Sequence, residues 1–465
     1  MAKENGSCRL PSADVAFLHM DRPTNLMVIN FAMLFDQPLE AQALHAALRT
    51  RLIERYPRFR MLVQESRLGL RRPSFAEDPN FELDRHVHTR ALPSPGDEEA
   101  LRSLVSKLVT APLDHSRPLW EMYLIERPGG GHALLVRVHH CIIDGIALAR
   151  VIVSLTDEAR EYEDSAAAQL AARVRAGEHD SPRGTGDSTE LIGAPRVREL
   201  IKRAPAGARA LAKLLLTPAD ARTALRGKLG VSRGVAWTGQ LDLARVKAIA
   251  RAQGATVNDV LLAAVSGALR RYLLDRGGEP RAIRTLVPVN LRPLDKPLPR
   301  ELGNRFGLVF LTLPVDVAER RERLQELTRR MSAIKRSPEG PVSYAILKTI
   351  GLTPPQVERR IVDIFTTKVS AMMTNVPGPS EVVHLTGSPL RAVQVWAPMS
   401  GSVGMSVSIF SYRGEVTIGL LADTGLVPDP QAIVGHVERE LEQLAALEPF
   451  AKTHSSAQPG EIVRR

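Results

Sequence analysis

The string HHCIIDG occupies residues 139–145 and follows an apolar segment with the pattern of a strand. A histidine at a strand end can present its imidazole to a cleft while the strand fixes its position. An ordinary imidazole has a pKa of about 6.5, so His139 and His140 are candidates to accept and return a proton near neutral pH. Asp144 is placed to orient the loop through a hydrogen bond or an ion pair, and Gly145 permits a backbone angle that a side chain resists. The string therefore predicts acid–base chemistry at the end of a strand.

The same string contains residue types that suit two other kinds of site. His139, His140 and Asp144 are possible metal ligands, but adjacent residues of an extended strand point to opposite faces, so the two histidines do not easily share one ion. We therefore expect no metal. Cys141 is a conceivable nucleophile, although apolar packing is the favoured interpretation. The chain has only one other cysteine, Cys8. Two cysteines are too few for a disulfide framework or a cysteine-based zinc site.

Helices and strands are predicted on both sides of this string. In the first half, apolar spacing predicts helices over residues 39–56 and 99–109. It also predicts a hairpin of two strands, over residues 120–126 and 133–139, whose second strand ends at the two histidines. In the second half it predicts helices over residues 243–252, 258–274 and 433–444. Strands are predicted there over residues 284–289, 307–313, 368–375, 404–412 and 415–421. Mixed elements in both halves predict an α/β or α+β protein.

Composition restricts the class of protein and its organisation. With 465 residues, 44% hydrophobic and 24% charged, the chain has the composition of a globular protein with two or three domains. Aromatic residues make up only 4%, which argues against base-stacking nucleic-acid folds. A small, acidic and Gly/Pro/Ser-rich stretch marks a linker. We therefore predict an amino-terminal unit, a connector, a carboxy-terminal unit and a disordered tail, over residues 1–155, 156–234, 235–450 and 451–465.

The net charge of +11 is concentrated in one segment. Residues 196–233 contain ten Lys and Arg against two acidic residues, with leucines between them, as in amphipathic helices broken near Pro205 and Pro218. Such a segment suits an anionic lipid surface, or it is a connector whose apolar face packs on its own protein. The first residues lack a signal peptide and no apolar stretch is long enough to span a bilayer. We expect a cytoplasmic protein with at most peripheral membrane contact.

The sequence resembles the bacterial wax ester synthase/diacylglycerol acyltransferase family, within the chloramphenicol acetyltransferase-like superfamily that includes condensation domains. Besides HHCIIDG, the resemblance rests on blocks PLDHSRPLWE, TVNDVLLAAV, VPVNLRP, ELGNRFG and TNVPGP, at residues 112–121, 256–265, 287–293, 301–307 and 374–379. It extends from about Phe17 to the closing helix, and His115 stands where the family more often has arginine. The resemblance implies two chloramphenicol acetyltransferase-like subdomains, each a mixed sheet with flanking helices, with a tunnel between them.

The resemblance also implies an activity. It indicates an O-acyltransferase that uses acyl-CoA as co-substrate, without a bound cofactor, to esterify diacylglycerol, long-chain fatty alcohol or both. His140 would be the general base of a direct transfer without an acyl-enzyme, since both substrates can be held together. Asp144 would form a structural ion pair, with Arg292 as a candidate partner.

Several further residues are candidates for substrate or oxyanion contacts, namely Asn258, Asp259, Arg292 and Asn375. Asn258 and Asp259 equally fit a helix start, because Thr256-x-x-Asp259 has the pattern of a capping box. Asn375 lies in a string that we interpret as a rigid turn. In the motif Pro118-Leu119-Trp120, the tryptophan is better explained as a core anchor.

Two alternatives to the lipid acyltransferase remain open. One is a condensation-type acyltransferase with another hydroxyl or amine acceptor. The other is a non-catalytic protein of the same fold that binds lipid or coats lipid droplets.

Overall fold

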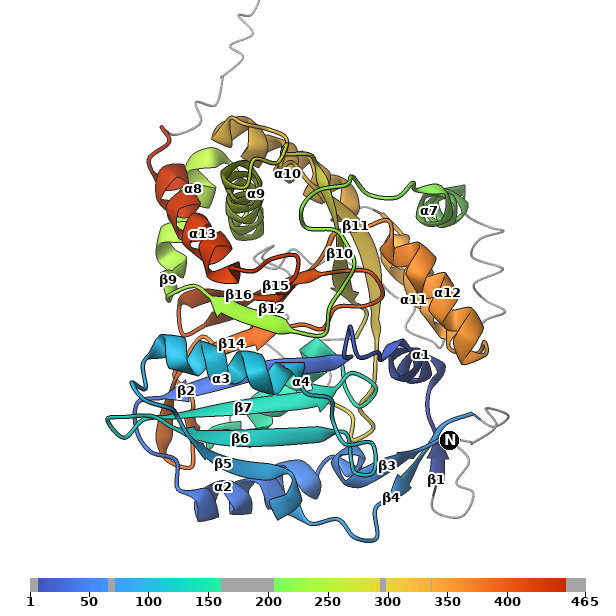
Figure 1. Cartoon of the computed structure of the whole chain (residues 1–465), viewed down its shortest axis with the longest axis vertical. Helices are drawn as coiled ribbons and strands as arrows, with labels where there is room; N and C mark the ends of the chain where they lie inside the picture. Colours follow the sequence, from blue (N-terminus) through green and yellow to red (C-terminus); the bar gives the residue numbers. More distant parts are fainter. Residues whose placement is uncertain (1–6, 66–71, 160–204, 293–297, 336, 449–465) are drawn as a thin grey trace, which may run out of the picture.

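The computed structural model describes residues 7–65, 72–159, 205–292, 298–335 and 337–448. Within them, two large mixed sheets lie one above the other (Figure 1). The lower sheet has the order β13 (His384–Leu385), β14 (Ser388–Trp396), β2 (Val28–Phe35), β7 (His132–His139), β6 (Trp120–Glu126), β5 (Val87–Ala91). The upper sheet has the order β11 (Phe306–Leu313), β10 (Ile283–Asn290), β12 (Ala371–Pro377), β15 (Met405–Tyr412), β16 (Glu415–Asp423), β8 (Arg233–Trp237), and β9 (Leu241–Asp242) pairs with β16. The mixed α/β fold predicted from the sequence is confirmed.

Helices cover both sheets. The lower body carries α2 (Ala41–Leu48), α3 (Glu98–Thr110) and α4 (Gly145–Leu155). The upper body carries α8 (Leu243–Gln253), α9 (Val257–Asp275), α10 (Arg320–Lys335) and α13 (Pro430–Ala445). To one side, α1 (Ser12–Met20) packs on α11 (Glu339–Ile350) and α12 (Pro355–Thr366), and α7 (Pro205–Leu216) packs on α11 (Figure 1). A small sheet of β1 (Ser7–Arg9), β4 (Ser74–Glu77) and β3 (Met61–Gln64) completes the lower body.

The most strongly patterned elements form where the sequence predicts them. The strand predicted over 120–126 is β6, and the helix predicted over 243–252 is α8, which ends at Gly254 in the left-handed conformation (φ 64°). The helix predicted over 39–56 is shorter, because α2 ends at Leu48 and continues as a π-helical turn, Arg49–Ile53. The string beginning at Asn375 is not a turn: β12 extends through Pro377 and pairs with β15 as far as Ser411.

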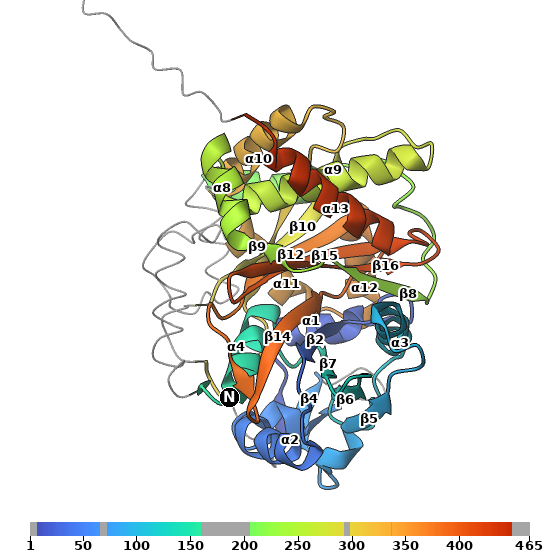
Figure 2. The same cartoon turned by 90° about the vertical axis from the view of Figure 1, so that its left-hand side faces the viewer.

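Strand β14 departs from the predicted division of the chain. It belongs to the sequence of the predicted 235–450 unit, yet it pairs antiparallel with β2 in the lower sheet, from Leu390 opposite Phe35 to Trp396 opposite Asn30 (Figure 2). Local composition does not reveal which sheet edge a strand will meet, so the prediction of contiguous units missed this crossover. The predicted 156–234 connector is described only in part, and the predicted 451–465 tail lies outside the described residues.

A shared core joins the two bodies. One cluster of buried side chains fills the lower body and another fills the upper body. A third cluster lies between them and contains Leu34 of β2, Trp237 of β8, Leu286 of β10 and Trp396 of β14. The two sheets therefore pack on each other. None of the helices in the described ranges is long and apolar enough to cross a bilayer.

The close packing of β11 on α11 gives a test of this arrangement. A methyl group at Gly307 would collide with the backbone of Gly340 on α11, whereas one at Gly435 on α13 would meet open space. We expect Gly307→Ala to lower the free energy of unfolding by about 2 kcal/mol or more. The control Gly435→Ala should raise it by about 0.5–1 kcal/mol, because alanine is the better helix former. Urea denaturation measures both, and equal effects of the two variants would contradict the packing.

Candidate active site

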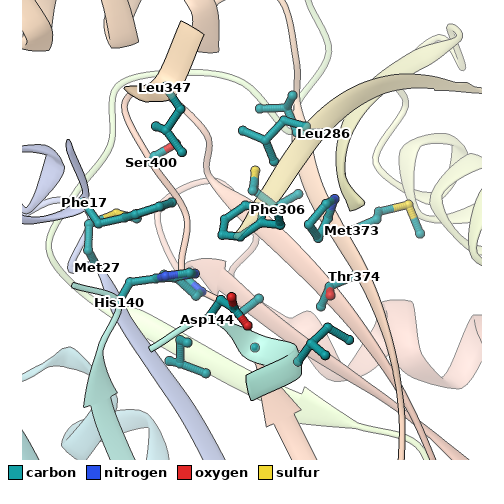
Figure 3. A pocket seen from close by; sticks show the side chains of 18 of the residues that line it. Phe17, Met27, His140, Asp144, Leu286, Phe306, Leu347, Met373, Thr374 and Ser400 are labelled. Atoms are coloured by element: carbon teal, nitrogen blue, oxygen red, sulfur yellow. The ribbon is translucent and has the colours of Figure 1, made fainter. Parts of the chain in front are cut away.

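A cavity lies between the two bodies where β7 ends (Figure 3). The space open to the centre of a water molecule is about 180 Å³, roughly ten times what one water requires. Most of its wall is apolar. The wall includes Phe17, Met27, His140, Asp144, Gly145, Leu286, Phe306, Leu347, Ile361, Val362, Phe365, Met373, Thr374 and Asn375. Such a wall suits an alkyl chain. Polar side chains interrupt it at His140, Asp144, Asn290, Ser343, Thr366, Thr374, Asn375 and Ser400.

His140 is held on this wall by three kinds of contact. Its backbone N–H donates to the carbonyl of Met27 (2.7 Å), and its ring nitrogen Nδ1 lies 2.7 Å from Oδ1 of Asn304. The imidazole stacks on the ring of Phe17, with centroids 4.2 Å apart and planes 11° from parallel. Burial lowers the pKa of His140, against the opposing effects of Asp144 and Asn304. The ring is therefore neutral at pH 7 and able to accept a proton.

His139 does not reach the cavity, although we counted it among the catalytic candidates. Consecutive side chains of a strand point to opposite faces, and only His140 is on the cavity wall. Nδ1 of His139 accepts the backbone N–H of Cys141 (3.1 Å), and burial lowers the pKa of His139 to about 4. The thiol of Cys141 is fully buried, which raises its pKa well above the ordinary value. This supports packing, rather than nucleophilic attack, as the role of the cysteine.

Asp144 has both carboxylate oxygens occupied. Oδ1 accepts the N–H of Ala147 and so caps α4, while Oδ2 accepts from Nη2 of Arg292 (2.8 Å) and the N–H of Arg305 (3.0 Å). The ion pair with Arg292 is present as the resemblance implied. Arg292 is not on the cavity wall, so the structure does not bring it to a substrate site.

Gly145 plays a different part from the one predicted. It begins α4 with ordinary helical backbone, since its φ is not in the left-handed region. A Cβ placed there meets nothing within 4 Å, and Gly145 lines the cavity. The prediction of a special backbone angle is therefore wrong. The glycine instead leaves space open beside His140.

Of the remaining candidates, Asn375 is on the wall, and its Nδ2 donates to Oδ1 of Asn258 (3.0 Å). Asn258 lies behind it, in the first turn of α9. Asp259 serves the helix: its side chain and that of Thr256 form the capping box that the sequence allowed. The structure therefore brings Asn375 to the cavity, with Asn258 as its support, and leaves Asp259 outside the wall.

The motif that contains Trp120 is part of the core. Trp120 is buried, its Nε1 donates to the carbonyl of Phe59 (2.6 Å), and its ring stacks on His86. Leu119 is buried in the same cluster, and Pro118 precedes it. The interpretation of Trp120 as a core anchor agrees with these contacts.

Sequence reasoning missed two residues of the site. Asn304 contacts His140, and Phe17 stacks on it. The only signal was that Asn304 belongs to the ELGNRFG block and that Phe17 begins the region of resemblance. Within the part of the chain that the structure describes, no group of three or more His, Cys, Asp or Glu side chains is arranged to hold a metal ion.

The fold and the site define a two-sheet mixed α/β protein with a cavity between the sheets and a neutral histidine on its wall. A wax ester synthase/diacylglycerol acyltransferase from Marinobacter aquaeolei has a similar structure, with a TM-score of 0.67 and 26% identity over 95% of this chain and 100% of that one. The first condensation domain of the calcium-dependent antibiotic synthetase shares the fold, with a TM-score of 0.60 and 16% identity over 95% and 96% of the two chains.

Family models match most of the chain. The catalytic domain of wax ester synthase/diacylglycerol acyltransferase matches residues 10–261, and the C-terminal domain of the same family matches residues 302–445. A probable diacylglycerol O-acyltransferase of Mycobacterium tuberculosis is 29% identical over 451 residues, which cover 94% of this chain and 96% of that protein. The chain therefore belongs to the wax ester synthase/diacylglycerol acyltransferase family of acyltransferases, as its motifs predicted.

The ion pair between Asp144 and Arg292 gives a test of how the site is supported. Both side chains are over 90% buried, so removal of one leaves the other charged and unpaired. We expect Arg292→Leu to lower the free energy of unfolding by about 3 kcal/mol. In a double-mutant cycle with Asp144→Asn, the combined loss should be at least about 1 kcal/mol smaller than the sum of the single losses. Additive losses in urea denaturation would show that the two side chains do not interact.

Proposed function

We propose that the chain is an acyl-CoA-dependent O-acyltransferase that esterifies diacylglycerol, a long-chain fatty alcohol or both, with His140 as general base. The observation that carries this proposal is the imidazole of His140, held by Asn304, on the wall of a mostly apolar cavity. An apolar wall suits long alkyl chains, and the family supplies the reaction class. The relative from Mycobacterium tuberculosis, named for diacylglycerol acylation, supports that acceptor.

The proposed reaction is a direct transfer. Nε2 of His140 takes the proton of the acceptor hydroxyl as its oxygen attacks the thioester carbonyl of acyl-CoA. The carbon–sulfur bond then breaks, the departing thiolate takes the proton from His140, and ester and free CoA leave. A thioester is already activated and both substrates are held together, so the step needs no acyl-enzyme.

Asn375 is the best placed candidate for the oxyanion. It lies on the cavity wall at the end of β12 and is held by Asn258. One donor to a developing oxyanion contributes about 3 kcal/mol to transition-state stability. The acyl-CoA in this scheme is a co-substrate, and the scheme calls for no bound cofactor.

The direct test is an acyltransferase assay with long-chain acyl-CoA and diacylglycerol, fatty alcohol or an amine as acceptor. We expect CoA release and ester formation, and we expect His140→Gln to lower kcat by about 100-fold or more, since the general base is lost. The matched control is His45→Gln on α2, outside the cavity, which should keep full turnover.

The outcomes separate the alternatives. Full activity of His140→Gln would refute the assigned base. Turnover with the amine but not with either alcohol would favour a condensation-type acyltransferase. Lipid binding without any turnover would favour the non-catalytic alternative.

Part of the basic segment supports a second element of the proposal, peripheral contact with an anionic lipid surface. Helix α7 packs Leu214 into the protein but leaves Leu215 and Leu216 55% and 80% exposed. Nζ of Lys368, just after α12, donates to the carbonyls of Leu214 and Leu215, so the ends of the two helices are neighbours. The described part of the connector therefore packs partly on its own protein, which is one of the two interpretations given above for the basic segment.

Helix α12 adds to the same surface. It exposes Val357 and Ile364 together with Arg359 and Arg360, while its inner side supplies the cavity wall. Apolar side chains next to arginines are the combination that anionic membranes attract. We therefore place the lipid contact on α7 and α12, directly over the cavity. Residues 196–204 of the basic segment lie outside the described residues.

Vesicle flotation tests this contact. The triple variant Leu215→Ser, Leu216→Ser, Ile364→Ser should bind anionic vesicles at least tenfold more weakly, since each inserted side chain contributes about 1.5 kcal/mol when fully buried. The control is Leu274→Ser, which removes an exposed leucine from α9. Undiminished binding by the triple variant, or an equal loss in the control, would contradict this surface.

A further inference from the structure

A chain of buried hydrogen bonds leads from His140 away from the cavity. Asn304 lies behind the imidazole, with Oδ1 2.7 Å from Nδ1 of His140. Nδ2 of Asn304 donates to Oδ1 of Asp14 (2.9 Å) and to the carbonyl oxygen of His140 (2.6 Å). Asp14 in turn accepts at Oδ2 from Nη1 of Arg58 (2.8 Å). All four side chains are buried, and of the four only His140 lines the cavity.

These partners determine how the Asn304 amide is oriented. Burial raises the pKa of Asp14, while Arg58 and the hydrogen bonds from Asn304 oppose that shift. Both oxygens already accept from donors, Oδ1 from the backbone N–H of Asn304 (2.9 Å) and Oδ2 from Arg58, and these contacts fit the carboxylate. A carboxylate oxygen and the carbonyl of His140 therefore face one end of the amide, and both are acceptors. That end must be the NH₂ group, because a flipped amide would place its oxygen against two acceptors.

The amide orientation determines which nitrogen of His140 carries hydrogen. The Oδ1 atom of Asn304 can only accept, so Nδ1 of His140 must donate to it. A neutral imidazole has one N–H, which leaves a lone pair on Nε2. The ring also cannot turn freely, because Phe17 stacks on one face and Phe306 lies with its centroid 5.6 Å away.

The backbone of the loop that carries Asn304 lies close against Asp14 and Arg58. Gly303 has a φ of +128°, and a Cβ there would lie 2.9 Å from Oδ2 of Asp14 and 3.1 Å from Nη1 of Arg58. The absence of a side chain lets the loop approach the Asp14–Arg58 pair. This approach delivers Asn304 to the imidazole.

We propose that Asn304 is a positioning residue, held by Asp14 and Arg58, that fixes the neutral tautomer of His140 with Nδ1 protonated and Nε2 free to act as base. The proposal deepens the proposed function and rests on it for the role of Nε2. Asn304 does not touch the cavity, so it acts on catalysis through His140 alone. Loss of Asn304 leaves the ring only the interaction with the backbone of His140 itself, so it weakens the preference for this tautomer and removes a hydrogen bond that favours the imidazolium formed during transfer.

The test combines kinetics with a measurement that does not depend on activity. Asn304→Ala should lower kcat by about 10- to 100-fold with KM nearly unchanged, because the base is misoriented while the wall is intact. The acid limb of its kcat/KM profile should move to lower pH, since the hydrogen bond that His140 donates to Asn304 raises the pKa of His140 in the wild type. The control Tyr344→Phe removes only a bond to the backbone carbonyl of Asn304 and should change kcat less than threefold.

The second measurement is ¹⁵N NMR of histidine-labelled wild-type protein, with the His140 signals assigned by their loss in His140→Gln. We expect a protonated Nδ1 and an unprotonated Nε2 at neutral pH. The opposite tautomer would overturn the proposal even if Asn304→Ala fails to fold. Equal kinetic losses in Asn304→Ala and Tyr344→Phe, with no shift of the acid limb, would also overturn it. Full activity of His140→Gln would instead refute the proposed base and leave the tautomer result standing.

Discussion

The site depends on hydrogen bonds between the loop at residues 303–305 and the strand end that carries His140. Asn304 contacts the imidazole, and the N–H of Arg305 and the guanidinium of Arg292 contact Asp144. Each group is withdrawn from water, and a buried polar group that loses its partner costs about 1–3 kcal/mol. Arg292 and Arg305 donate to Asp144 across the boundary between the bodies, whereas His140 donates in the opposite direction, to Asn304. The contact therefore fixes the relative position of the bodies together with the orientation of the histidine.

Apolar contacts bring the two bodies together, but they do not by themselves determine the relative position of the bodies. Strand β14 joins the lower sheet and its Trp396 packs in the core shared with the upper sheet. Hydrophobic burial of this kind is non-directional, so it tolerates small shifts of one body against the other. The hydrogen bonds and the Asp144–Arg292 ion pair are directional and do not tolerate such shifts. Because the cavity lies at this boundary, side chains from β2, α4, β11 and β12 surround one space together with His140.

Local patterns in the sequence predicted local structure, whereas the one distant contact that was expected, Asp144 with Arg292, came from the resemblance to the family. Strand β6 and helix α8 were predictable because periodicity and a terminal glycine act within a few residues, and His140 and Asp144 were found because they share one short string. Asn304 is 164 residues from the histidine that it contacts, and no local pattern connects them. The sheet joined by β14 was missed for the same reason. The ELGNRFG block marked the position of Asn304 but gave no indication of its partner.

The two adjacent histidines show how far the environment, rather than the residue type, determines chemistry. Both are buried, and burial lowers the pKa of each. In the described structure Nε2 of His139 has no hydrogen-bond partner, and its ring faces away from the cavity, so its low pKa of about 4 serves no transfer. His140 has Asn304 at one nitrogen, Asp144 nearby to stabilise a positive charge, and the cavity in front of it. In the proposed reaction, burial keeps His140 neutral at rest, and Asp144 and the hydrogen bond to Asn304 favour its brief protonation, which is the balance that a proton-returning base requires.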